Sequence, residues 1–123
     1  MVDDHRAFLA AMRALLEASN VLEAVAEATS GEEAVELAQQ AEPDMVLMDV
    51  LLPGIDGIEA ARAIKARRPS TVVVLTSTMR PEELPVEAHD GVADAVIWKS
   101  DLEPRLLDDI WLRSGNHALP QTA

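Results

Sequence analysis

The sequence predicts one α/β domain with a doubly wound, parallel β-sheet. Short β-branched or apolar segments alternate with single amphipathic segments along the whole chain, and the connections between them are short. The chain has 123 residues, a length that fits one hydrophobic core. Its content of 49% hydrophobic and 26% charged residues is typical of a globular protein. We detect no internal repeat, low-complexity block or interdomain linker.

The N-terminal region predicts a helix followed by a strand. Residues 5–18 place apolar side chains at the spacing of one helical face, and Asp3 and Asp4 precede them where they could cap the first turn. Residues 21–28 contain small and β-branched side chains, interrupted by two glutamates. This pattern predicts a short strand.

A second helix and a buried strand come next. Ser30 and Glu33 have the spacing of a capping box, and an apolar stripe then runs to about Ala41. Residues 45–48 form a continuous apolar run, typical of a strand buried on both faces of a parallel sheet. We expect this strand to end at Asp49.

The middle of the chain predicts a loop, a helix and a central strand. Residues 53–57 contain the proline and glycines of a loop, and Asp56 and Gly57 are expected to turn the chain and start the helix. The helix covers residues 58–68, because its last turn is basic and a proline follows it. Residues 71–76 are the most β-branched stretch of the chain and predict a central strand.

The C-terminal region predicts a weak helix, a strand and a final helix. Pro85 lacks an N–H group, so we expect regular helix only over residues 85–89. Residues 95–98 form the last strand, and residues 102–113 have the apolar periodicity of a helix. The domain is therefore expected to cover residues 1–113, followed by a flexible tail over 114–123.

Composition excludes several classes of function. Twenty-two acidic and ten basic residues give a net charge of −12, and the basic residues form no stripe that could follow a phosphate backbone, so nucleic-acid binding is not expected. The absence of cysteine excludes disulfides, thiolate metal sites and cysteine nucleophiles. No apolar run is long enough for a membrane span, and the first residues lack the features of a signal peptide. We therefore expect a soluble, cytoplasmic protein.

Polar residues with complementary chemistry follow the predicted strands. Ligands of such sheets bind beyond the carboxyl ends of the strands, so side chains placed there are expected to converge. Carboxylates gathered at one edge repel one another unless a cation is present, and Mg²⁺ prefers oxygen ligands. A carboxylate beside such an ion can attack phosphorus, while a lysine neutralises the phosphoryl oxygens. The residues expected at this edge are Asp3, Asp4, Asp49, Thr76 and Lys99.

The chain resembles the receiver domain of bacterial two-component response regulators over about residues 2–112. Any one matching segment is weak evidence, whereas the segments together, in this order and spacing, are specific. They are Val2-Asp3-Asp4-His5, Gly31-Glu32-Glu33-Ala34, residues 43–49, residues 52–57, Val74-Leu75-Thr76-Ser77 and residues 94–99. The resemblance implies a flavodoxin-like, five-stranded sheet of order 2-1-3-4-5.

The resemblance also implies a function and a role for each site residue. A sensor histidine kinase would transfer a phosphoryl group to Asp49. The ligands of Mg²⁺ would be Asp3, Asp4, Asp49 and the backbone carbonyl of Leu51. Thr76 and Lys99 would bind the phosphoryl group.

The chain departs from the family pattern at two places that affect signalling. Val96 stands where the family usually has an aromatic residue, and a valine cannot make the aromatic rotamer change that accompanies activation. Pro85 weakens the helix that usually contributes to the output and dimer face. The chain is most like receivers that carry a C-terminal helix-turn-helix domain, which is not present after Arg113. The partner would be a protein effector or such a DNA-binding domain, and a homodimer is a further option.

Simpler interpretations of these residues stay open. Asp3 and Asp4 could only cap a helix, Thr76 could only favour a strand, and Lys99 could be solvated. His5 beside the acidic pair is more often a surface residue than a ligand.

Three other functions compete with phosphoacceptance. A pseudo-receiver would signal without phosphate. A phosphohydrolase commonly needs a second acid two residues after the nucleophile, where this chain has Leu51, so we expect no enzyme activity beyond slow self-dephosphorylation. A Rossmann nucleotide-binding enzyme is disfavoured because no glycine-rich turn follows a strand.

The first strand of the expected sheet is largely missing. Met1 and Val2 could supply about 7 Å of strand, against roughly 17–20 Å for a typical one. We therefore expect two unpaired strand edges, with the acidic pair attached only through the first helix. A late start site, a truncation or a natural variant would each produce this pattern.

Overall fold

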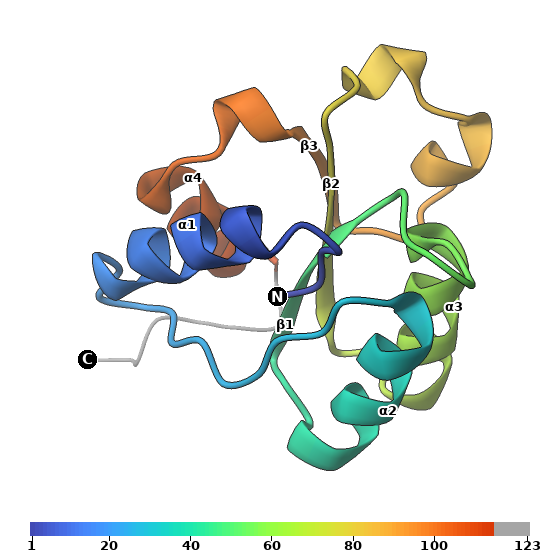
Figure 1. Cartoon of the computed structure of the whole chain (residues 1–123), viewed down its shortest axis with the longest axis horizontal. Helices are drawn as coiled ribbons and strands as arrows, with labels where there is room; N and C mark the ends of the chain where they lie inside the picture. The colour runs from blue at the N-terminus through green and yellow to red at the C-terminus, as the bar shows by residue number, and fades with distance from the viewer. Residues whose placement is uncertain (115–123) are drawn as a thin grey trace.

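The computed structural model describes residues 1–114 and places a parallel sheet between two pairs of helices (Figure 1). Its helices are α1 (Arg6–Glu17), α2 (Gly31–Ala41), α3 (Gly57–Arg67) and α4 (Pro104–Arg113), and its strands are β1 (Met45–Asp49), β2 (Val72–Ser77) and β3 (Ala95–Trp98). Three short 3₁₀ helices are η1 (Pro81–Glu83), η2 (Val86–His89) and η3 (Lys99–Asp101). The predicted tail, apart from Ser114, lies outside the described residues.

The three strands run parallel in the order β1-β2-β3. In this register Asp49 stands opposite Thr76, and Thr76 stands opposite Ile97. The carboxyl ends of the strands therefore meet at one edge of the sheet, as the sequence predicted. This edge carries the candidate site.

Alternate strand residues fill two separate apolar layers, one on each face of the sheet. One layer lies beneath α1 and α4, and the other lies beneath α2 and α3 (Figure 1). The first includes Met12, Leu47, Val72, Val74, Ile97 and Leu107, and the second includes Val46, Met48, Ile58, Ala61, Ile64, Val73 and Leu75. Burial on both faces explains why the strand sequences are continuously apolar.

The expectation of two unpaired strand edges beside the first strand is wrong at the carboxyl end. Val2 forms parallel bridges to both Ala28 and Met48. Its N–H donates to the carbonyl oxygen of Leu47 (2.8 Å), and its own carbonyl accepts from the N–H of Asp49 (3.0 Å). On the other side, the N–H of Asp3 donates to Ala28 (3.1 Å) and the N–H of Ala28 donates to Met1 (3.0 Å). The acidic pair is thus anchored through the sheet as well as through α1.

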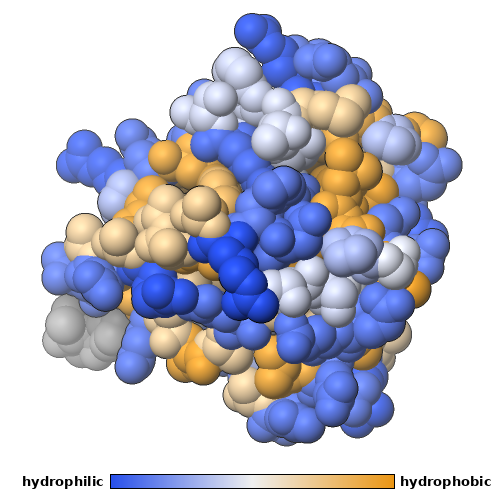
Figure 2. Space-filling model, viewed as in Figure 1, coloured by the Kyte–Doolittle hydropathy of each residue, from blue (hydrophilic) through white to orange (hydrophobic). Residues whose placement is uncertain are grey.

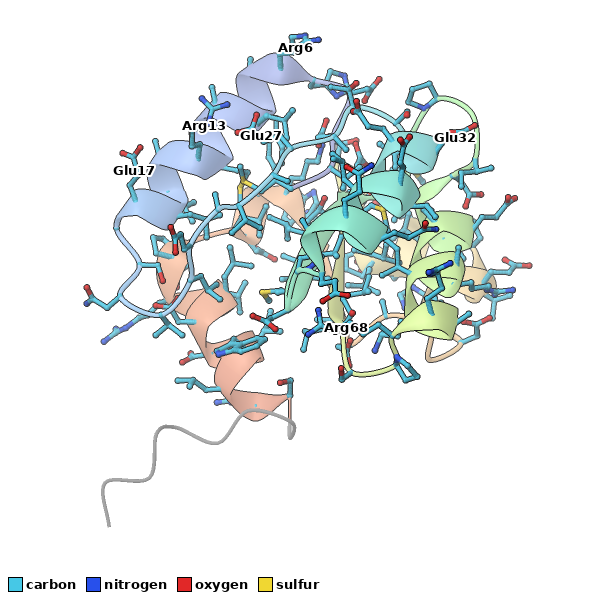
Figure 3. The ribbon with its side chains drawn as sticks, turned by 90° about the horizontal axis from the view of Figure 1, so that it is seen from below. Arg6, Arg13, Glu17, Glu27, Glu32 and Arg68 are labelled. Carbon is cyan, nitrogen blue, oxygen red and sulfur yellow. The ribbon has the colours of Figure 1, made fainter. Side chains whose placement is uncertain are left out.

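The predicted strand over residues 21–28 is also wrong, because within the described range 1–114 only Ala28 of this segment has a strand partner. A strand needs a neighbour along its length to satisfy its backbone groups. Here a cavity of about 90 Å³, lined mainly by apolar residues, lies between residues 22–28 and β1. The segment is held to α1 instead by an ion pair between Arg13 and Glu27 (2.6 Å), whose side chains point toward one another in Figure 3. The spatial order of Ala28, Val2 and β1 to β3 still follows 2-1-3-4-5.

The predicted helix caps are partly confirmed. Ser30 accepts a hydrogen bond from the N–H of Glu33 (3.1 Å), and Asp56 accepts from the N–H of Glu59 (2.9 Å). The N-cap of α1, however, is His5, and its side chain makes no capping hydrogen bond. Asp3 therefore does not cap the helix, because its carboxylate is engaged elsewhere.

The region around Pro85 contains no regular α-helix, which corrects the short helix predicted there. Two 3₁₀ helices, η1 and η2, flank Pro85, and Val86 is largely exposed. The lost N–H group of the proline prevents one continuous helix from forming across both segments.

The face of the molecule drawn in Figure 2 is mainly hydrophilic. Figure 2 shows blue residues over most of the visible face, with hydrophobic residues in patches between them. No described helix combines the length and the apolar character that crossing a bilayer would require.

Gly57 allows the start of α3 to approach β1, and its replacement tests this packing. A Cβ atom at Gly57 would collide with the backbone carbonyl of Asp49. Helix propensity alone would make Gly57→Ala stabilising by about 0.5–1 kcal/mol, whereas the collision is expected to destabilise the fold by about 1–3 kcal/mol. Urea unfolding of both proteins measures the difference. A higher urea midpoint for Gly57→Ala than for the wild-type chain would show that stability does not require the close approach of α3 to β1.

Candidate functional site

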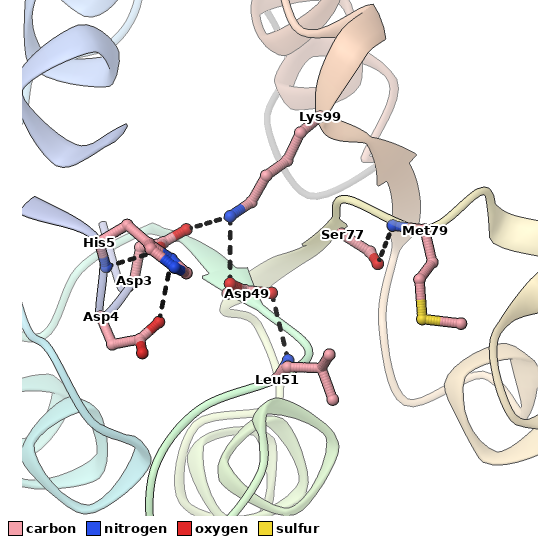
Figure 4. Close-up of polar contacts among 8 residues, drawn as sticks. All are labelled: Asp3, Asp4, His5, Asp49, Leu51, Ser77, Met79 and Lys99. Atoms are coloured by element: carbon pink, nitrogen blue, oxygen red, sulfur yellow. Dashed lines mark hydrogen bonds and ion pairs between the residues drawn. The ribbon is translucent and has the colours of Figure 1, made fainter. Parts of the chain in front are cut away.

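Three charged side chains from distant parts of the chain meet at the carboxyl edge of the sheet. The Nζ atom of Lys99 donates to Oδ2 of Asp3 (2.5 Å) and to Oδ2 of Asp49 (3.1 Å), so it lies between the two carboxylates (Figure 4). Asp3 is 1% exposed and Asp49 is 5% exposed. Asp3 follows the Val2 bridge, Asp49 is the last residue of β1, and Lys99 follows β3, which is why parallel pairing brings them together.

Burial and charge pairing set the pKa values of this cluster. Burial alone would raise the pKa of Asp3, but hydrogen bonds from Lys99 and His5 outweigh it, and the pKa lies below its ordinary value of 3.8. For Asp49 burial prevails over the attraction of Lys99, and the pKa lies above 3.8. Burial would lower the pKa of Lys99, yet its bonds to Asp3 and Asp49 raise it above 10.5. Lys99 is therefore a fixed positive charge.

Asp4 and His5 extend the cluster toward solvent. The Nδ1 atom of His5 lies 3.0 Å from Oδ1 of Asp3 and 3.2 Å from Oδ1 of Asp4. One ligand atom from each of Asp3, Asp4, His5 and Asp49 falls within 4.8 Å of the others. This arrangement offers a divalent cation three carboxylates and one imidazole.

Thr76 contributes a buried hydroxyl group that has no partner among the described residues. It is 1% exposed and stands opposite Asp49 in the β1–β2 register, so both side chains lie on the same side of the sheet. Its hydroxyl makes no hydrogen bond to any other residue of the range 1–114, whereas that of neighbouring Ser77 accepts from the N–H of Met79 (2.9 Å; Figure 4). A buried hydroxyl without a partner is costly, which points to a ligand at this position.

Leu51 contacts the cluster through its backbone, whereas Val96 packs against an apolar layer of the sheet. The N–H of Leu51 donates to Oδ1 of Asp49 (3.2 Å) and thereby orients the carboxylate, while its side chain is exposed. Val96 stands opposite Leu75 and packs, partly buried, against the apolar layer beneath α2 and α3.

Sequence reasoning missed Phe8 as a residue near the site. The centroid of its ring lies 4.1 Å from Nζ of Lys99, a distance that gives a cation–π contact. The available signal was its position in the first turn of α1, four residues after Asp4, which directs one helical face toward the acidic edge. The apolar periodicity alone indicated only a core residue.

Comparisons with known proteins agree with this geometry. The family model described as the response regulator receiver domain matches residues 1–110. The transcriptional regulatory protein LiaR of Bacillus subtilis is 31% identical over 98% of this chain and 67% of LiaR. The nitrate/nitrite response regulator protein NarL of Escherichia coli is 32% identical over 85% of this chain, but the match covers only 48% of NarL.

The fold itself is found in a solved receiver domain. The signal receiver domain of the putative response regulator NarL from Mycobacterium tuberculosis superimposes with a TM-score of 0.82 and 28% identity. The match covers 91% of this chain and 93% of that domain. The predicted α/β receiver fold is therefore confirmed.

Removal of the Lys99 ammonium is expected to destabilise the folded chain. Lys99→Met leaves Asp3 and Asp49 buried without their shared cation, at a cost of about 3 kcal/mol at pH 7. The matched control is Lys65→Met, because Lys65 pairs with Asp94 (2.6 Å) at a more exposed position and should contribute about 1 kcal/mol or less. Urea unfolding of the two variants compares their losses in the free energy of unfolding. Equal losses would contradict the stabilising role assigned to Lys99.

The loss caused by Lys99→Met is also expected to depend on pH. The pKa of Asp3 is lowered in the folded state, so its stabilising ionisation is present above pH 3.8 and disappears as pH falls through the lower folded value. The stability gap between the wild-type chain and Lys99→Met should therefore narrow below pH 3.8. A gap that stays constant through this range would exclude the carboxylate pairing as its cause.

Proposed function

Because this chain belongs to the response regulator receiver domain family, we propose that it accepts a phosphoryl group from a sensor histidine kinase on Asp49 in a Mg²⁺-dependent reaction. The observation that carries the proposal is the buried contact of Lys99 with Asp3 and Asp49, next to the unpartnered hydroxyl of Thr76. Together these groups provide a nucleophile, a fixed positive charge and a hydrogen-bond donor.

The transfer follows from these three side chains. A carboxylate oxygen of Asp49 attacks the phosphorus of the kinase phosphohistidine, the P–N bond breaks, and its electron pair stays on the imidazole nitrogen, which takes a proton. The product is an acyl phosphate on Asp49. Burial makes the Asp49 carboxylate more basic, and hence more nucleophilic, than an exposed one.

The neighbouring cation and hydroxyl stabilise the transferred group. Lys99 lies 3.1 Å from Oδ2 of Asp49 and needs little movement to neutralise the phosphoryl oxygens. The hydroxyl of Thr76 has no competing partner to give up, so it is free to donate to the same group.

The donor set fits the metal ion that the family implies. Asp3, Asp4 and Asp49 would hold Mg²⁺ with their carboxylates, and Leu51 would contribute its backbone carbonyl. When bound, the ion supplies positive charge to the phosphoryl oxygens. The clustering of carboxylate oxygens within 4.8 Å and the unpartnered hydroxyl of Thr76 support this assignment.

The proposed output is a conformational change passed to a partner. That partner is a protein effector or a DNA-binding domain, since LiaR is a transcriptional regulatory protein and the chain covers about half of NarL. Val96 leaves no aromatic side chain at its own position to change rotamer, so the signal is proposed to depend on Thr76 and the backbone around it. We place the receiver unit at residues 1–113 and its action in the cytoplasm, where a kinase donor would meet it.

Phosphorylation can be tested by intact mass after incubation with acetyl phosphate and Mg²⁺. The wild-type chain is expected to gain one phosphoryl group, whereas Asp49→Asn and the wild-type chain in excess EDTA should gain none, because the nucleophile or the ion is missing. The matched control, Asp109→Asn, replaces an exposed acid on α4 and should behave as wild type. An unmodified wild-type chain would favour the pseudo-receiver interpretation, in which the domain signals without phosphate.

The chain is further proposed to lack hydrolase turnover beyond slow self-dephosphorylation. Leu51 stands two residues after Asp49 and presents an exposed apolar side chain, so no acid is available there to activate water. A steady-state assay with excess acetyl phosphate should release no more phosphate than the decay of the phosphorylated chain allows. Sustained multiple turnover would contradict this assignment and indicate a phosphohydrolase.

A further inference from the structure

We propose that His5 is an additional metal ligand, and that the acidic cluster accepts a divalent transition-metal ion that favours imidazole, such as Zn²⁺, as well as Mg²⁺. The inference rests on the metal site of the proposed function. It adds the imidazole of His5 to the oxygen ligands that the proposed function already assigns. If His5 is a ligand, the site should discriminate between Mg²⁺ and ions that favour an imidazole nitrogen.

The spacing of the ligand atoms carries the proposal. A six-coordinate ion with bonds of about 2.1 Å holds neighbouring ligand atoms about 3.0 Å apart. The Nδ1 atom of His5 lies 3.0 Å from Oδ1 of Asp3 and 3.2 Å from Oδ1 of Asp4, so each of these two oxygen atoms already lies at the distance from the imidazole nitrogen that neighbouring ligands would have (Figure 4).

The fourth ligand atom comes from Asp49 and closes the cluster. All four ligand atoms lie within 4.8 Å of one another, while opposite ligands of such an ion are about 4.2 Å apart. A contraction of at most about 0.6 Å is therefore required. The side chain of His5 is 67% exposed and Asp4 is 40% exposed, so rotation of these two side chains can supply it.

The surroundings hold the ligands as expected of a metal site. The N–H of His5 donates to Oδ1 of Asp3 (2.9 Å), which fixes the backbone beside the imidazole. Lys99 donates to the outer oxygen of Asp3, and the N–H of Leu51 donates to Asp49. Such outer contacts orient ligands and tune their basicity. The buried, unpartnered hydroxyl of Thr76 beside Asp49 independently points to a ligand at this edge.

The ligand types decide which ions are favoured. Three carboxylate oxygens suit Mg²⁺, but a neutral imidazole nitrogen adds little for that ion and suits Zn²⁺, Ni²⁺ and Co²⁺. A set of one nitrogen and three oxygens should therefore raise affinity for these ions selectively. The simpler interpretation is an ion pair of protonated His5 with Asp3 and Asp4, in which His5 competes with every cation to the same extent.

Calorimetric titration of the full, untagged chain with Zn²⁺ and, separately, Mg²⁺ distinguishes these interpretations. His5→Ala is expected to lower Zn²⁺ affinity by at least about tenfold while Mg²⁺ affinity stays the same or rises. His5→Asn keeps a residue that caps helices well and lacks an imidazole, so it should lose Zn²⁺ affinity in the same way. The matched controls His89→Ala and His117→Ala should leave both affinities unchanged.

The outcomes separate this inference from the proposed function. If both affinities stay unchanged in His5→Ala, or shift together by one factor, His5 is not a ligand, while the Mg²⁺ site remains. If the wild-type chain binds neither ion, the metal site of the proposed function fails and this inference fails with it. Loss of Zn²⁺ affinity in His89→Ala or His117→Ala, with none in His5→Ala, would place the Zn²⁺ elsewhere and overturn the inference.

Discussion

The contact of one ammonium group with two buried carboxylates governs the architecture of this chain. Asp3 and Asp49 follow adjacent positions of the sheet and carry like charges in a region shielded from water. Their repulsion would oppose the pairing of Val2 with β1 unless a cation lay between them. Lys99 supplies that cation from 96 residues away, because β3 ends at the same edge. Sheet register and charge balance therefore depend on each other.

The same contact prepares the site for chemistry. An exposed lysine would have to lose hydration and rotamer freedom before binding a phosphoryl group, whereas Lys99 has already lost both. The ring of Phe8 lies against its ammonium and limits its movement further. Stability and proposed activity thus use the same side chains, and the buried charge is tolerated because both partners are in place.

Residues with strong local signals were predictable from sequence. The apolar strands over β1 and β2, the caps at Ser30 and Asp56, and the convergence of Asp3, Asp49 and Lys99 all follow from local pattern plus parallel topology. The features that sequence did not predict depend on contacts between distant segments, although the expected packing of Phe8 against the core is confirmed. Residues 21–28 have strand-like composition but lack a neighbour over most of their length, and Phe8 has core-like spacing but lies against Lys99. Propensity describes a residue alone, whereas these outcomes depend on what lies beside it.

The N-terminal residues show which contacts of the sheet hold the acidic pair. A first strand in this position has two tasks, namely to pair its neighbours and to deliver an acidic pair beyond its carboxyl end. The second task depends only on the last residues, and Val2 performs it with bridges on both sides. Pairing the neighbours involves the whole length of a strand. Among the described residues this pairing occurs only next to the site, through Val2, and residues 22–27 have no strand partner. Backbone pairing is therefore present beside Asp3, and the apolar cavity lies between residues 22–28 and β1, where Met1 and Val2 also line it.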